Sequence, residues 1–185
     1  MSIHILGIFG SLRQESSNQG LVKLAQKLAP TDVTFTFYDK IGSLPFYNED
    51  LEEPSRTPSN VVEWRNLVTS ADALFIASPE YNFGPSAVLK NAIDWATRPM
   101  GQHALSGKVI SLMSSSGGTG GAHMIEQLGG ILGLLGNTML SEPSGQIAKG
   151  ADRISANGTT TDPAIEALVR TRLQALVDTA NNLGK

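Results

Sequence analysis

The stretch ADALFIAS, residues 71–78, is an almost unbroken run of apolar side chains. A half-exposed strand or an amphipathic helix would place polar residues at regular intervals in such a run. Runs without those intervals are typical of central strands in parallel sheets, because helices cover both faces of such a sheet. We therefore expect residues 71–78 to form a strand in the middle of a parallel sheet.

Strand-like and helix-like segments alternate on both sides of this stretch. Strands are expected at residues 3–9, 33–38, 108–114 and 137–140, and helices at residues 18–28, 58–70, 86–97, 122–135 and 163–183. This alternation favours right-handed crossovers that cover both faces of one sheet. The predicted fold is α/β: a doubly wound five-stranded parallel sheet in the order 2-1-3-4-5, with helices on both faces, in a single domain over residues 1–185.

The composition is that of an ordinary globular protein, with 41% hydrophobic and 17% charged residues. The net charge of −3 gives no reason to expect nucleic acid or a membrane as a partner. The chain has no cysteine, so disulfides and thiolate chemistry are excluded, and redox chemistry would need a cofactor or a metal ion. Without an apolar run of about 18 residues or a signal-like N-terminus, a cytoplasmic location is expected.

Three loops rich in glycine, serine and asparagine follow predicted strands, at residues 10–18, 78–85 and 114–121. In a sheet of order 2-1-3-4-5, ligands bind outside the carboxyl ends of the strands, where the order reverses between the first and third strands. The loops after the first, third and fourth strands all reach that place. We expect them to form one binding site.

The first loop, GSLRQESSN at residues 10–18, has the groups that a phosphate monoester needs. Its hydroxyls, its amide, its arginine and the N–H groups at the start of the next helix all favour an anion. The glycine patterns of dinucleotide and nucleoside triphosphate sites do not occur in the sequence. A plain polar turn is the alternative. The expected phosphate-binding residues are Ser11, Arg13, Ser16, Ser17 and Asn18.

The second loop, SPEYNFGPS at residues 78–86, combines stiffness with aromatic surface. Its prolines restrict the backbone, and its aromatic rings suit contact with a flat heteroaromatic ring. Glu80 could act as an acid or base, although one carboxylate alone does not establish that role. A surface turn with one buried aromatic is the alternative. The candidate binding residues are Pro79, Glu80, Tyr81 and Asn82.

The third loop, SSSGGTGG at residues 114–121, contains four glycines. A backbone without side chains can come close to a ligand and point N–H donors at it. Such donors would suit the carbonyl edge of a ring, whereas a merely flexible loop is the alternative. The candidate residues here are Ser114, Gly117 and Gly118.

The order and spacing of three motifs resemble the NADPH-dependent FMN reductase family of flavodoxin-like proteins. These motifs are GSLRQESSN at 10–18, PEYNFGPSAVLKNAIDW at 79–95 and SSSGGTGG at 114–121. The resemblance implies a flavodoxin-like fold and an FMN cofactor, with NADPH or NADH as co-substrate. It assigns Ser11, Arg13, Ser16 and Asn18 to the FMN phosphate, residues 79–82 to the isoalloxazine ring, and Ser114, Gly117 and Gly118 to its pyrimidine side.

The same resemblance implies an oxidoreductase with ping-pong kinetics, in which hydride passes from NAD(P)H through FMN to a small-molecule electron acceptor. Quinones, azo compounds, flavins and metal oxyanions are the implied acceptors, and no catalytic residue is assigned because FMN carries the chemistry. A homodimer or homotetramer is also implied. In it, the helix with Ile93, Trp95 and Arg98 lies at the interface, and residues 44–52 approach an active site. Residues 141–160 have no clear counterpart in the family pattern.

Two other functions fit the same fold. A non-enzymatic electron carrier such as flavodoxin would also bind FMN, but such carriers tend to be strongly acidic, and this net charge is only −3. A phosphate-controlled signalling module would need an acidic pocket where this chain has hydroxyls and Arg13. The histidines, His4, His103 and His123, do not have the spacing of metal ligands, so no metal site is expected.

Overall fold

A parallel sheet in the order β2-β1-β3-β6-β7 forms the middle of the computed structural model, which describes residues 2–183. Its strands are Ile3–Phe9 (β1), Val33–Tyr38 (β2), Ala73–Ala77 (β3), Val109–Ser116 (β6) and Thr138–Met139 (β7). The run at residues 71–78 forms β3, which lies in the centre of the sheet and pairs with β1 and β6. All five residues of β3 are buried. The predicted order and the flavodoxin-like fold are therefore confirmed.

The fifth position of the sheet is divided between two short strands. β7 pairs with the start of β6, and a further strand, Gln146–Ala148 (β8), pairs in parallel with Ser114–Ser116 at the end of β6. The sequence predicts only the first of these strands, at residues 137–140, and no strand within residues 141–160. β8 could not be predicted, because a strand of three residues is too short to show the alternation that identifies a strand in a sequence.

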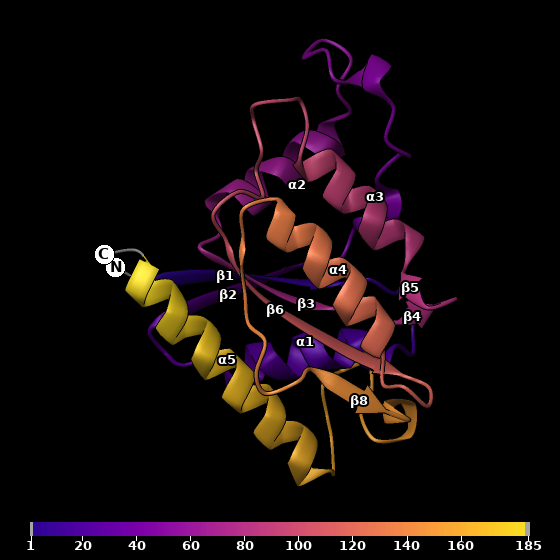
Figure 1. Ribbon diagram of the computed structural model, residues 1–185, viewed down its shortest axis with the longest axis vertical. Helices are drawn as coiled ribbons and strands as arrows, with labels where there is room; N and C mark the ends of the chain where they lie inside the picture. Colours follow the sequence, from indigo (N-terminus) through magenta and orange to yellow (C-terminus); the bar gives the residue numbers. More distant parts are fainter. Residues whose placement is uncertain (1, 184–185) are drawn as a thin grey trace.

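Two helices cover one face of the sheet and three cover the other (Figure 1). The first pair is Ser17–Leu28 (α1) and Pro163–Leu183 (α5), and the other three are Ser59–Ser70 (α2), Ala87–Ala96 (α3) and Ala122–Leu134 (α4). Because each helix turns an apolar face to the sheet, the two faces of the sheet carry separate buried clusters. Within residues 2–183, no helix has the length and apolar character needed to cross a membrane.

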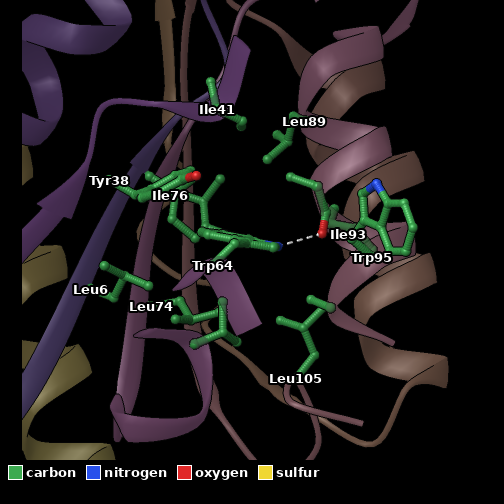
Figure 2. Packing of buried hydrophobic residues seen from close by; sticks show 14 of the residues in the cluster. Leu6, Tyr38, Ile41, Trp64, Leu74, Ile76, Leu89, Ile93, Trp95 and Leu105 are labelled. Atoms are coloured by element: carbon green, nitrogen blue, oxygen red, sulfur yellow. Dashed lines mark hydrogen bonds between the residues drawn. The ribbon is translucent and has the colours of Figure 1, made fainter. Parts of the chain in front are cut away.

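The cluster under α2, α3 and α4 is centred on Trp64, shown in Figure 2. Its indole Nε1 donates a hydrogen bond of 2.8 Å to the carbonyl of Ala92, which joins α2 to α3 inside the core. The spacing of the apolar residues in this helix predicts that Val61 and Val62 both point inward. Val62 is instead exposed, because Val61, Trp64 and Val68 share the buried side of the helix at intervals of three and four residues.

Side chains cap the starts of α1 and α5. Ser16 is the N-cap of α1, and its hydroxyl accepts a hydrogen bond from the N–H of Gln19. Asp162 caps α5, since its carboxylate accepts the N–H of Ala164 at 2.9 Å. The amide of Asn18 is therefore available for a different contact.

Candidate functional site

A cavity of about 240 Å³ lies where β1, β3 and β6 end, at the edge of the sheet that the three glycine- and serine-rich loops share. Most of the residues singled out from the sequence line it: Ser11, Arg13, Ser16, Ser17, Asn18, Pro79, Glu80, Tyr81 and Gly117. Asn82, Ser114 and Gly118 are not part of its lining. Four lining residues were not anticipated: Ser115, Ser116, Lys149 and Ala151.

The first loop forms the end of the cavity next to α1. Buried serine hydroxyls at positions 11, 16 and 17 face the same space as the first turn of the helix. The N–H groups of Ser17 and Asn18 have no acceptor within the helix, because the first turn of any helix leaves its N–H groups unpaired. Arg13 adds a positive charge, and one of its guanidinium N–H groups donates to the carbonyl of Glu15 at 2.7 Å. This end of the cavity suits an anion.

The side chain of Asn18 joins the first loop to the third. Its Nδ2 donates to the carbonyl of Ser115 at 2.9 Å, and its Oδ1 accepts the N–H of Ser115 at 2.8 Å. The hydroxyl of Ser115 donates to that of Ser17 at 2.8 Å. Both ends of the Asn18 amide are thus occupied by the backbone of β6, which fixes the distance between the two loops.

The second loop folds as a small hairpin of two strands, Glu80–Tyr81 (β4) and Gly84–Pro85 (β5). Its turn residues, Asn82 and Phe83, both have positive φ angles, 49° and 66°, as a two-residue turn between twisted strands requires. Gln127 of α4 holds the turn through a hydrogen bond of 2.9 Å from its amide to the carbonyl of Phe83. Asn82 therefore sits at the tip of the hairpin and outside the cavity.

Glu80 ties this hairpin to the start of α4. Its carboxylate accepts the N–H of Met124 at 3.0 Å and the hydroxyl of Thr119 at 3.1 Å, and it lies 3.3 Å from Nδ1 of His123. Partial burial raises the pKa of Glu80, but these hydrogen bonds outweigh it and the net result is a lowered pKa. An ionised, fully engaged carboxylate positions its neighbours and is poorly suited to act as a general acid.

The third loop is supported from below by Ser114, which is fully buried. Its hydroxyl lies 3.0 Å from that of Ser116, and a Cβ atom added at Gly121 would collide with it. Gly121 also has a φ of 87°, a conformation that side chains disfavour. The sequence assigned Ser114 and Gly117 to the ligand. Of these two, only Gly117 lines the cavity, next to Ser115 and Ser116, because β6 continues two residues further than expected.

A second, mainly apolar hollow of about 390 Å³ adjoins the cavity. The two share Arg13 and Tyr81, and the hollow is completed by Gly10, Leu12 and residues 86–88. Leu12 and Tyr81 are both exposed there. The combined site has an anion-binding end beside α1 and an apolar end beside Tyr81, which suits an aromatic ligand with a charged tail.

The helix expected at a subunit interface places two of its three named residues in the core instead. Ile93 and Trp95 are buried within the chain, and Nε1 of Trp95 donates to the carbonyl of Pro45 at 2.8 Å. Arg98 is partly exposed and lies over the ring of Tyr47. Any interface at this helix would therefore use its other face.

Residues 44–52 do not reach the cavity of their own chain. Asn91 and Trp95 hold this segment against α3, and Figure 1 shows the loop around the short helical turn Glu49–Leu51 (η2) projecting away from β4 and β5. Phe46 is 81% exposed on it. Within residues 2–183, no group of three or more His, Cys, Asp or Glu side chains is placed to hold a metal ion.

Comparison with known proteins gives consistent results. The family described as NADPH-dependent FMN reductase matches residues 3–152. A 2-hydroxy-1,4-benzoquinone reductase of Burkholderia sp. is 38% identical over 159 residues, which cover 85% of each chain. An NAD(P)H-dependent FMN reductase of Pseudomonas aeruginosa is 37% identical over 175 residues, covering 94% of this chain and 93% of that one.

One solved structure extends the agreement to the whole fold. FerB, a flavoenzyme NAD(P)H:(acceptor) oxidoreductase from Paracoccus denitrificans, superposes with a TM-score of 0.87 at 34% identity, covering 97% of this chain and 98% of that one. The matched region includes all three loops of the site. The chain belongs to the NADPH-dependent FMN reductase family and is an oxidoreductase that uses FMN and NAD(P)H.

Proposed function

We propose that this enzyme reduces quinones and related small acceptors, with FMN held in the cavity and its substrates bound in the adjoining hollow. The observation that carries the proposal is the continuity of the anion-binding end at α1 with the apolar end at Tyr81. Bound FMN would supply the redox chemistry, taking hydride from NAD(P)H and passing electrons to the acceptor. Similarity to enzymes named benzoquinone reductase and quinone reductase supports quinones as acceptors.

The chain's own residues would bind and orient the cofactor. The hydroxyls of Ser11, Ser16 and Ser17 and the guanidinium of Arg13 would hold the phosphate, with help from the first turn of α1. The amide of Asn18 would act indirectly, since it is engaged with Ser115 and can only keep the loop in place. The backbone N–H of Asn18, in the first turn of α1, would still be available to the phosphate.

The ring of FMN would lie between the hairpin and the third loop. Pro79, Glu80 and Tyr81 line the cavity on one side, and Ser116 and Gly117 line it on the other. A Cβ atom at Gly117 or Gly118 would meet nothing within 4 Å, so the backbone there is open to a ligand. Its N–H groups could donate to the pyrimidine edge of the ring, which favours negative charge there.

The apolar hollow at Leu12 and Tyr81 would receive both substrates in turn. It is open and lacks charged side chains other than Arg13, so it can accept flat molecules of different kinds. If NAD(P)H and the acceptor use the same hollow, the oxidised nicotinamide must leave before the acceptor binds. Ping-pong kinetics would follow.

The test begins with the colour of the purified protein. We expect a flavin absorption spectrum that bleaches on anaerobic addition of NADPH or NADH and returns on addition of a benzoquinone. Steady-state rates at several quinone concentrations should give parallel double-reciprocal lines. A flavin that NAD(P)H does not reduce would support the electron-carrier alternative. A colourless protein that does not bind added FMN would overturn the proposal.

We also propose that the chain forms a homodimer or homotetramer through the layer of α2, α3 and α4. Among the described residues, four large apolar side chains are exposed on segments of this layer: Phe46, Val62, Met100 and Leu134, of which Leu134 is 92% exposed. We expect Leu134→Glu to reduce the molar mass measured by light scattering. Leu183→Glu, on the exposed end of α5, is the matched control. A monomeric wild-type protein would refute this.

Two further expectations stay proposals. We propose that the whole chain acts as one domain and works in the cytoplasm, which suits a sequence without cysteine. A single cooperative unfolding transition, and recovery of activity in the cytosolic fraction, are the corresponding tests.

A further inference from the structure

We propose that Lys149 is a second cation for the phosphate of the cofactor, presented by residues 146–153 as a rigid arm. The inference rests on the proposed binding of FMN and adds a residue that the three sequence motifs do not contain. Lys149 lines the cavity together with Arg13, Ser16 and Ser17, although it lies more than a hundred residues further along the chain.

A short chain of contacts links the arm to the phosphate end of the cavity. Gly150 packs directly on Ser115: a Cβ atom at Gly150 would collide with the Ser115 hydroxyl. That hydroxyl donates to Ser17, the first residue of α1. Lys149 and Ala151 flank Gly150, so they lie beside the helix start that we assign to the phosphate.

Hydrogen bonds hold the backbone of the arm. β8 pairs with the end of β6, and the N–H of Lys149 donates to the carbonyls of Ser116 at 2.8 Å and Gly117 at 3.2 Å. Within the arm, Arg153 donates to the carbonyls of Ala148 and Lys149, and its ion pair of 2.8 Å with Asp162 ties the arm to the residue before α5. Lys149 keeps a φ of 51°, which a non-glycine residue adopts only where its surroundings impose it.

The charges around the cavity favour a dianion. Its lining contains two cations, Arg13 and Lys149, and one carboxylate, Glu80. The carboxylate is occupied by donors at the start of α4. Within residues 2–183, Lys149 takes part in no ion pair, and its side chain is exposed at the mouth of the cavity. An ammonium group on a flexible stem can therefore reach a phosphate held at α1.

The experiment compares FMN with riboflavin, which has the same ring and no phosphate. Dissociation constants are measured by flavin fluorescence titration of the apoprotein for wild type, Lys149→Gln, Lys149→Arg and Arg170→Gln. The last variant removes one positive charge from an exposed position on α5, where Arg170 pairs with Glu166. We expect Lys149→Gln to weaken FMN binding about tenfold and to leave riboflavin binding unchanged. Lys149→Arg and Arg170→Gln should bind FMN as the wild type does.

The salt concentration provides a second test. The difference in FMN affinity between wild type and Lys149→Gln should become smaller as the ionic strength rises. Equal FMN affinity of the two proteins would overturn the proposal, and so would an equal loss of FMN and riboflavin binding, which would indicate a contact with the ring or a change of the arm. Unchanged FMN affinity with a higher KM for NADPH but not for NADH would assign Lys149 to the nucleotide's additional phosphate. If wild type itself does not bind FMN, the proposed function fails, and not this residue assignment alone.

Discussion

Asn18 and Ser115, which are 97 residues apart in the sequence, exchange two hydrogen bonds in the buried space between the start of α1 and the end of β6. The Oδ1 atom of Asn18 accepts the N–H of Ser115, and its Nδ2 atom donates to the carbonyl of Ser115. The side chain of Asn18 therefore pairs both backbone groups of this residue of β6. The loop at α1 and the glycine-rich loop after β6 are the two walls of the cavity. The distance between these two loops therefore depends on the side-chain amide of Asn18.

Replacing Asn18 with alanine should lower both stability and cofactor affinity. The change leaves a buried N–H and a buried carbonyl of Ser115 without partners, which costs about 1–3 kcal/mol in the free energy of unfolding. Urea denaturation of the apoprotein measures this loss, and flavin titration measures the weaker binding. Asn181→Ala, at an exposed position on α5, is the control and should change neither quantity.

Replacing Arg13 with alanine should weaken FMN binding without unfolding the apoprotein. Arg13 is exposed, and its guanidinium has one hydrogen bond, to the nearby carbonyl of Glu15, so the fold depends little on it. Loss of a charge-assisted contact with phosphate should raise the dissociation constant of FMN about 10- to 100-fold. Riboflavin affinity should stay the same, and Arg13→Lys should restore part of the FMN affinity. Normal FMN binding by Arg13→Ala would remove this residue from the site.

Glu80 should make the stability of the protein depend on acid pH. Because the pKa of Glu80 is lower in the folded state than its ordinary value of 4.5, the ionised carboxylate stabilises the fold above that pH. The stabilisation is lost as pH falls through the lowered pKa, when the carboxylate gains a proton. Wild type should therefore melt at a higher temperature than Glu80→Gln at neutral pH, and this difference should disappear as the pH falls below the lowered pKa of Glu80. A difference that does not change with pH would contradict this account.

Arg172 should stabilise the divided fifth strand. Arg172 is 1% exposed, and its guanidinium donates to the carbonyls of Leu140 and Pro143, which lie between β7 and β8, and to the hydroxyl of Ser111. Burial lowers the pKa of Arg172 to about 10, so it remains charged at neutral pH. Arg172→Leu should destabilise the protein by about 1–3 kcal/mol, because the lost hydrogen bonds outweigh the relief of burying a charge.

The matched control for Arg172 is Arg170→Leu, two residues earlier on the same helix and exposed to solvent. It should change the urea midpoint only slightly. Comparable losses of stability in Arg172→Leu and Arg170→Leu would mean that the buried hydrogen bonds of Arg172 contribute little to the stability of the fold. Since β8 leads into the arm that carries Lys149, Arg172→Leu should also weaken FMN binding.

Most elements of the fold were predictable because each depends on short stretches of sequence. The buried run at residues 71–78 identified β3, and the cap at Asp162 marked the start of α5. The errors arose where neighbours decide the outcome. Val62 points outward because Trp64 fills the space under α2, and β8 exists because the end of β6 offers it a partner.

By itself, the sequence determined the order of strands and helices, the place of the three loops and the resemblance to flavin reductases. These follow from periodicity and from residue types within a few positions of one another. Only the tertiary structure decided that Asn18 holds Ser115, that Glu80 turns to α4 and that Lys149 reaches the cavity. The partner of a polar side chain can lie far away in the sequence, as Ser115 does from Asn18, about a hundred positions apart. The pattern of neighbouring residues does not identify such a partner.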